Sequence, residues 1–262
     1  MVAQPLLFTI EFRRKMAELP LQERMDWLES LARRMRSGED EPGVVQELRE
    51  VARGCRLPLV ENIQRQLGPF DAAHLRALVE VPREKFVRDE DLERSADDVP
   101  LPLDEQGLAT ISAPHAYLLS FRLLELSAGD SLIELGSGSG YGAALASFIV
   151  GRDGRVLTFE IDGGLARWAA KNLEDEDNVQ VAHGDAMTSA REWGGAKKIV
   201  VTFAVAELPA SWIDSIPEGG RLVAPVGSRE RDQKLVLVRR ERGKIVRTEH
   251  GAVRYVQNRS GK

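Results

Sequence analysis

The sequence has little of what metal-binding and disulfide-bonded proteins use, with one cysteine, Cys55, and four histidines among 262 residues. A single thiol cannot form an internal disulfide, and no cluster of Cys and His suggests zinc, so we expect no metal. Long apolar runs are also missing, because the longest, residues 141–150, is far shorter than the ~20 residues of a membrane span. Arg13 and Arg14 follow the first apolar residues, which is the wrong order for a secretory signal. We therefore expect a cytoplasmic protein with no membrane partner.

An excess of positive charge is absent as well. The chain has 36 basic and 41 acidic side chains, a formal net charge of -5 and a pI near 5.6. This balance argues against a general nucleic-acid binder, which needs a basic surface for phosphates. Hydrophobic residues make up 43% of the chain, enough for a real core, and this excludes a wholly disordered protein.

The first third of the chain has the period of amphipathic helices. Two apolar stripes recur at helical spacing, the first being Leu21, Met25, Leu28, Ala32 and Met35, and the second Val44, Leu48, Val51 and Cys55. Asp71 is predicted to cap a further helix over residues 71–81. We expect residues 1–66 to form a helical extension whose stripes pack near that helix. Cys55 is then a packing residue and not a nucleophile.

From residue 131 the period changes. Short β-branched runs are predicted as strands at 131–135, 155–161, 178–182, 198–203 and 221–226. Helical segments lie between them near 141–150, 163–174 and 208–216, and a hairpin is predicted from 234–239 and 244–248. This alternation predicts an α/β fold with a doubly wound, mostly parallel sheet that helices cover on both faces.

The strongest local signal is the glycine-rich turn after the first of these strands, at residues 136–141. Gly136, Gly138 and Gly140 let a backbone approach a ligand closely, because glycine has no Cβ and tolerates positive φ. Ligands of open parallel sheets bind beyond the carboxyl ends of the strands, where this turn must lie. The dinucleotide pattern G-x-G-x-x-G fails at Tyr141, although a shifted frame allows the looser G-x-G-x-x-A. The turn alone does not name the ligand.

Two acids at the next two strand ends narrow the choice. Glu160 ends the second strand, where a carboxylate can accept both ribose hydroxyls of a nucleoside. Asp185 follows the third strand and is placed to accept a hydrogen bond from an adenine amino group; the alternative is that it caps a helix over 186–193. The turn and both acids fit S-adenosyl-L-methionine, which has no pyrophosphate to bind.

Several segments resemble the protein-L-isoaspartate O-methyltransferases. The most specific is Thr110-Ile111-Ser112 followed by Pro114, about twenty residues before the glycine turn. Similar matches occur at 81–87, 100–103, 219–227 and 253–256, so the resemblance covers roughly residues 67–257. It implies a class I, Rossmann-like, S-adenosyl-L-methionine-dependent methyltransferase domain over 67–257, preceded by the extension and followed by a tail at 258–262.

The resemblance also implies the roles of individual residues. Thr110, Ile111 and Ser112 would line the active site, with the Ser112 hydroxyl contacting the substrate carboxylate. His115 would orient the following helix, because a carboxylate is already ionised at pH 7 and needs no base. The implied cofactor-binding residues are Glu134, Gly136, Ser137, Gly138, Ser139, Gly140, Tyr141, Glu160, Ile161, Gly184, Asp185 and Ala186.

Three departures from the family pattern bear on the substrate. Leu108 stands where the family has glutamine, residues 202–206 replace a run of small residues beside the substrate, and the extension is additional. Phe203 and Val205 are expected to reshape the pocket wall. The first hypothesis is therefore carboxyl methylation of an aspartyl or isoaspartyl residue in a protein or peptide. The second is a methyltransferase dedicated to one aspartate of a modified peptide, leading to an imide, and the third a non-catalytic cofactor-binding interaction protein. The sequence leaves the oligomeric state open.

Overall fold

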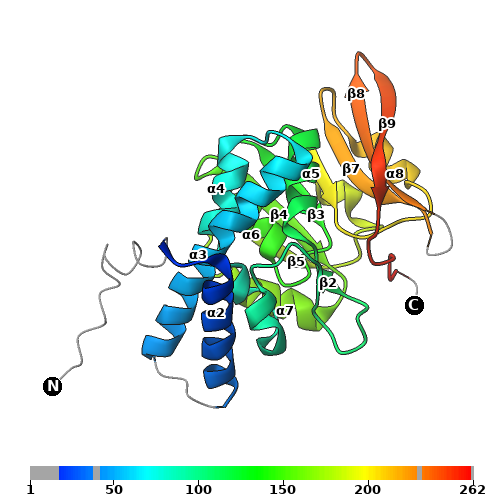
Figure 1. Cartoon of the computed structure of the whole chain (residues 1–262). Coiled ribbons are helices and arrows are strands. Elements are labelled where there is room, and N and C mark those ends of the chain that lie inside the picture. Colours follow the sequence, from blue (N-terminus) through cyan, green and yellow to red (C-terminus); the bar gives the residue numbers. More distant parts are fainter. Residues whose placement is uncertain (1–17, 38–41, 229–231, 261–262) are drawn as a thin grey trace.

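The computed structural model describes residues 18–37, 42–228 and 232–260. Its centre is a seven-stranded sheet of order β5-β4-β3-β6-β7-β8-β9 (Figure 1), in which the first five strands of that order are parallel. The parallel strands are β3 (Ser131–Leu135), β4 (Arg155–Glu160), β5 (Val179–His183), β6 (Lys198–Val201) and β7 (Arg221–Val226). Strand order reverses at β3, between β4 and β6, so a ligand site is expected at the carboxyl end of β3. The predicted doubly wound, mostly parallel sheet is confirmed.

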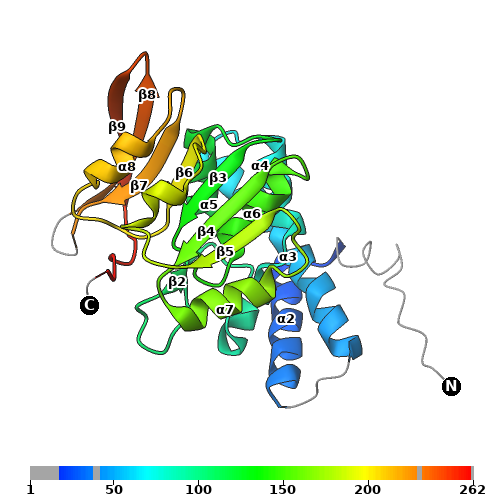
Figure 2. The same ribbon diagram turned by 180° about the vertical axis from the view of Figure 1, so that it is seen from behind.

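Helices cover both faces of this sheet, as the two opposite views show (Figures 1 and 2). One face packs against α5 (Pro114–Leu124), α6 (Tyr141–Val150) and α7 (Gly163–Asn172). The other packs against the 3₁₀ turn η3 (Ser189–Glu192) and α8 (Ala210–Ser215), with Trp193 and Trp212 buried there. The central strands β3, β6 and β7 are mostly buried, which explains their continuous apolar runs, whereas the residues of the edge strand β5 are partly or fully exposed.

The N-terminal helices are α2 (Leu21–Arg36), α3 (Pro42–Leu67) and α4 (Ala72–Glu80). Leu28 and Ala32 of the first predicted stripe are buried, as are all four residues of the second, and Asp71 caps α4 by accepting a hydrogen bond from Ala73 N at 2.7 Å. Helix α3 packs on α4, and the buried residues of α2 and α3 join the core cluster of α5 and α6. The described part of the extension thus packs on the remainder of the chain near α4, as predicted. No helix in the described ranges is long and apolar enough to span a bilayer.

Two antiparallel strands extend the sheet beyond β7, namely β8 (Gln233–Glu241) and β9 (Lys244–Val253). Arg242 and Gly243 connect them, both with positive φ, as a two-residue hairpin turn requires. The predicted hairpin is confirmed, and both strands are longer than predicted. A second, two-stranded sheet, β1 (Leu101–Pro102) with β2 (Thr110–Ile111), was not predicted and presents the segment before Ser112.

Candidate active site

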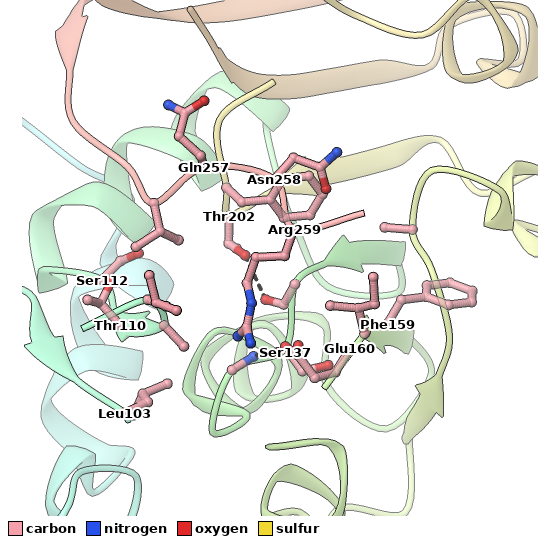
Figure 3. A pocket seen from close by; sticks show the side chains of 18 of the residues that line it. Leu103, Thr110, Ser112, Ser137, Phe159, Glu160, Thr202, Gln257, Asn258 and Arg259 are labelled. Carbon is pink, nitrogen blue, oxygen red and sulfur yellow. Dashed lines mark hydrogen bonds between the residues drawn. The ribbon is translucent and has the colours of Figure 1, made fainter. Parts of the chain in front are cut away.

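A pocket enclosing about 700 Å³, part of it open to solvent, lies at the carboxyl ends of β3 and β4 (Figure 3). It brings together eleven of the fifteen predicted site residues. Three come from the β2 segment, and eight come from the ends of β3, β4 and β5 and the turns that follow them. They are Thr110, Ile111, Ser112, Gly136, Ser137, Gly138, Ser139, Glu160, Ile161, Asp185 and Ala186.

The glycine turn forms the floor of the pocket, with φ of 100° at Gly136 and 53° at Gly138. A Cβ added at Gly138 would lie 2.9 Å from Cδ1 of Leu103, which also lines the pocket. Both positions favour glycine because of the positive φ, and at Gly136 a Cβ would also clash with the side chain of Thr202. The turn keeps its backbone open to a ligand that lies over it.

Glu160 stands beside this turn and is tied to it. Its carboxylate accepts hydrogen bonds from Gly138 N at 2.8 Å and Asp162 N at 3.1 Å. Burial raises the pKa of Glu160 above its usual value, while these two N–H donors act in the opposite direction. The held carboxylate keeps further acceptor capacity toward the pocket, as recognition of a hydroxyl pair requires.

Asp185 lies at the third strand end, after β5. Its Oδ1 accepts hydrogen bonds from Met187 N at 2.9 Å and from the Ser260 hydroxyl at 2.6 Å. The helix that the capping alternative predicted over 186–193 is limited to the 3₁₀ turn η3. Asp185 caps only a local turn, and it also lines the pocket.

The segment around Ser112 is held by its main chain. The Arg83 guanidinium, which is 1% exposed, donates to the carbonyl of Ser112 at 3.2 Å and to three other carbonyls, those of Ser95, Asp97 and Val99. Ser112 N donates to the Tyr117 hydroxyl at 3.3 Å. With its backbone fixed from both sides, Ser112 keeps its side chain on the pocket wall (Figure 3).

His115 does not line the pocket but orders its border. Its backbone N and its Nδ1 both lie within 3.0 Å of Asp98 Oδ1, at the start of α5. Burial alone would raise the pKa of Asp98, yet the hydrogen bonds from His115 outweigh it, and the pKa falls below its usual value. This geometry agrees with the predicted orienting role.

Four predicted cofactor residues lie outside the pocket lining: Glu134, Gly140, Tyr141 and Gly184. Side chains alternate along β3, so Glu134 points away from the face of Ile133 and Leu135, toward α6. It accepts a hydrogen bond from the Thr158 hydroxyl at 2.7 Å, which also bonds to Ser137. Tyr141 begins α6, and its ring packs on Tyr117 with centroids 5.4 Å apart. These four residues therefore adjoin the residues that line the pocket but do not line it themselves.

Sequence reasoning missed part of the wall. Phe203 lines the pocket, as expected, whereas Val205 is buried in a bridge with Val226 and does not. Leu108, which was noted only as a departure from the family pattern, lines the pocket as well. The largest omission is the C-terminal segment, residues 256–260, all five of which line the pocket. The tail predicted at 258–262 thus contributes wall residues as far as Ser260, and residues 261–262 lie outside the described part. The other lining residues are Leu103, Ala109, Tyr117, Phe159 and Thr202.

The residues present fit S-adenosyl-L-methionine. The glycine floor is space that a Cβ at Gly138 would fill, and Glu160 and Asp185 offer carboxylates at neighbouring strand ends. Phe159 and Ile161 add an apolar wall beside Glu160. The pocket thus combines acceptors for a nucleoside with apolar walls, as small-molecule sites usually do.

Comparison with known proteins identifies the family. The family model "Protein-L-isoaspartate(D-aspartate) O-methyltransferase (PCMT)" matches residues 58–262. The protein-L-isoaspartate O-methyltransferase 1 of Geotalea uraniireducens is 43% identical over 175 residues, covering 66% of this chain and 78% of that protein. The enzyme of that name from Pyrobaculum arsenaticum is 37% identical over 202 residues, covering 76% of this chain and 95% of that protein.

Solved structures agree. A protein-L-isoaspartate O-methyltransferase superposes with a TM-score of 0.71 at 27% identity, over 77% of this chain and 65% of that one. A Plasmodium falciparum structure of the same family, in complex with S-adenosyl-L-homocysteine, gives 0.69 at 25% identity, over 79% of this chain and 99% of that one. The chain therefore belongs to the protein-L-isoaspartate O-methyltransferase family, with the class I, Rossmann-like methyltransferase fold.

Proposed function

We propose that this protein is an S-adenosyl-L-methionine-dependent carboxyl methyltransferase that acts on isoaspartyl residues of proteins or peptides. The observation that supports it best is that Thr110, Ile111 and Ser112 share one pocket with the glycine turn, Glu160 and Asp185. Family membership favours this function over the dedicated peptide methyltransferase and over the non-catalytic binding protein.

The cofactor would be held along the ends of β3, β4 and β5. Gly136 and Gly138 provide a surface without side chains. Glu160 accepts hydrogen bonds from the ribose hydroxyls, and Asp185 accepts one from the adenine amino group. When bound, S-adenosyl-L-methionine supplies a methyl group that its positive sulfonium activates. Glu134, Gly140, Tyr141 and Gly184 support this site from outside the lining.

The substrate carboxylate would lie against the Ser112 segment. No hydrogen bond engages the Ser112 hydroxyl within the described residues, so it is available to donate to a carboxylate oxygen. No general base is needed, because the carboxylate is ionised at neutral pH. The protein's contribution is alignment of two bound reactants, which in well-oriented systems lowers a barrier by about 7–11 kcal/mol.

The test is methyl transfer to a matched pair of short peptides. One contains an isoaspartyl residue, and the other contains a normal aspartyl residue at the same position. With methyl-labelled S-adenosyl-L-methionine, we expect base-labile label on the isoaspartyl peptide and almost none on its partner. Equal labelling of both would refute isoaspartyl selectivity, and labelling of neither would refute the proposed activity.

A further inference from the structure

The C-terminal segment places one cation in a pocket whose other charged residues are acids. Of the described residues that line the pocket, only Arg259 is basic, and the acidic ones are Glu160 and Asp185. Figure 3 shows its guanidinium between the side with Thr110 and Ser112 and the side with Ser137 and Glu160. The family model extends through residue 262, but the motifs matched in the sequence end at Val256, and they assign no role to Arg259.

The backbone that carries Arg259 is fixed on both sides. Ala204 N donates to Val256 O at 2.7 Å, and Asn258 N donates to Ala204 O at 2.9 Å, so the segment pairs with the turn after β6. On the other side, the Ser260 hydroxyl bonds to Asp185. Residues 256–260 therefore form a fixed part of the pocket wall, and their backbone holds Arg259 at a defined position beside the pocket.

The side chain of Arg259 is held more loosely than its backbone. Its described ion pair is with Asp162, 3.5 Å away, and both side chains keep about a third of their surface exposed, at 34% and 37%. Solvent-exposed ion pairs of this kind contribute little to stability, with a median of about 0–1 kcal/mol. A stronger partner can take the guanidinium from Asp162 at small cost, and an incoming carboxylate is such a partner.

The charge of the proposed substrate supplies that partner. An isoaspartyl residue is linked through its side-chain carboxyl group and leaves its main-chain carboxylate free. The pocket already holds the carboxylates of Glu160 and Asp185, so a cation on the protein favours the binding of this further anion. The hydroxyl of Ser112 gives one hydrogen bond but no charge. Arg259 offers both charge and a planar donor fork that matches a carboxylate.

We propose that Arg259 is a specificity-determining, substrate-binding residue that leaves Asp162 to bind the free carboxylate of the isoaspartyl residue. This inference rests on the proposed function, because that function defines the substrate as a carboxylate. It assigns selection for negative charge to the C-terminal segment, while Ser112 orients the bound group.

The test measures binding without methyl transfer. In the presence of S-adenosyl-L-homocysteine, calorimetry compares a short isoaspartyl peptide with the same peptide carrying a carboxamide in place of the free carboxylate. Wild type should prefer the carboxylate by roughly ten-fold or more, the usual value of a charge-assisted pair. Arg259→Gln should lose that preference, and Arg259→Lys should retain part of it.

Two controls separate this role from others. Arg254→Gln removes a charge from an exposed position two residues before this segment and should keep the full preference. Asp162→Asn keeps the cap that Oδ1 provides to α7 but removes the charge paired with Arg259, and should also keep it. All variants should bind S-adenosyl-L-homocysteine within a few-fold of wild type.

The inference is overturned if Arg259→Gln keeps the wild-type preference, if wild type has no preference, or if Arg259→Gln weakens only cofactor binding. It is also overturned if Asp162→Asn reproduces the effect of Arg259→Gln. The proposed function fails separately. Wild type that prefers the carboxylate but transfers no methyl group refutes the activity and leaves the role of Arg259 standing.

Discussion

At the scale of single residues, Glu134 shows how strand alternation decides what a side chain can do. It lies two residues before the glycine turn, but its side chain is 1% exposed and faces α6. Burial raises the pKa of Glu134 to about 8, against which the hydrogen bond from Thr158 acts only in part. At neutral pH the folded protein therefore favours the protonated form.

This raised pKa makes stability depend on pH. Between the ordinary value of 4.5 and about 8, the folded state binds the proton more tightly than the unfolded state does. The contribution of Glu134 to stability is therefore largest at low pH and is lost as pH rises through this range. Glu134→Gln should make the free energy of unfolding fall less steeply as pH rises through this range. Urea unfolding at a series of pH values measures this dependence. If the free energy of unfolding depends on pH in the same way in wild type and Glu134→Gln, the buried, protonated state is contradicted.

Glu160 is the residue with the most direct proposed contact to the cofactor. Glu160→Ala removes a charged acceptor for the ribose hydroxyls, so we expect affinity for S-adenosyl-L-methionine to fall about ten-fold or more. Calorimetry on wild type and variant measures the change. Glu174→Ala, at an exposed position outside the pocket, is the matched control. Equal affinities for wild type and Glu160→Ala would remove Glu160 from the site.

At the scale of elements, an ion pair connects α3 to the segment whose Arg83 holds the main chain of Ser112. Arg56 of α3 forms a 2.6 Å ion pair with Glu84, and both side chains are 4% exposed. Glu84 follows Arg83, whose guanidinium binds the carbonyl of Ser112. On the same helix, Arg53 pairs with Glu80 at 2.9 Å, but there both side chains are at least a third exposed.

These two pairs predict different costs of disruption. Arg56→Met leaves Glu84 as a buried charge without its partner, which costs about 3–5 kcal/mol. Arg53→Met breaks an exposed pair and should cost no more than about 1 kcal/mol. Denaturant unfolding of both variants gives the comparison. Similar losses for the two would contradict the claim that the buried pair anchors α3.

The elements themselves were largely predictable, and the reasons are physical. β3 and β7 have the predicted bounds, because apolar runs bounded by glycine and charged residues give a clear signal. The sequence did not predict β1 and β2, which are two residues long each, since such short strands have no measurable period. The helix over 186–193, considered only as the capping alternative for Asp185, is limited to the 3₁₀ turn at Ser189–Glu192.

At the scale of the whole molecule, the site could be predicted where it follows the strand ends and not where distant segments meet. Ligands of open parallel sheets bind beyond the carboxyl ends of the strands, and this rule predicts the positions of the turn after β3, of Glu160 and of Asp185. Residues 256–260 could not be predicted in this way, because their place depends on how the chain returns after β9 to pair with Ala204. No local pattern encodes such a return.

The described part of the N-terminal extension contributes no residue to the pocket lining. Deletion of residues 1–41, which removes α2, should therefore leave affinity for S-adenosyl-L-methionine within a few-fold of wild type. Stability should fall, because Leu28, Leu31 and Ala32 are buried in the shared core. Calorimetry and thermal unfolding measure the two effects. A folded, truncated protein that no longer binds the cofactor would contradict this separation.

The most direct test of carboxyl methylation at the isoaspartyl position uses one peptide that contains both an isoaspartyl and a normal aspartyl residue. After incubation with wild type and S-adenosyl-L-methionine, tandem mass spectrometry locates the added methyl group. We predict one methyl ester, on the isoaspartyl residue, and its near absence with Ser112→Ala. A methyl ester on the normal aspartyl residue, or none on either, would contradict this account of the site.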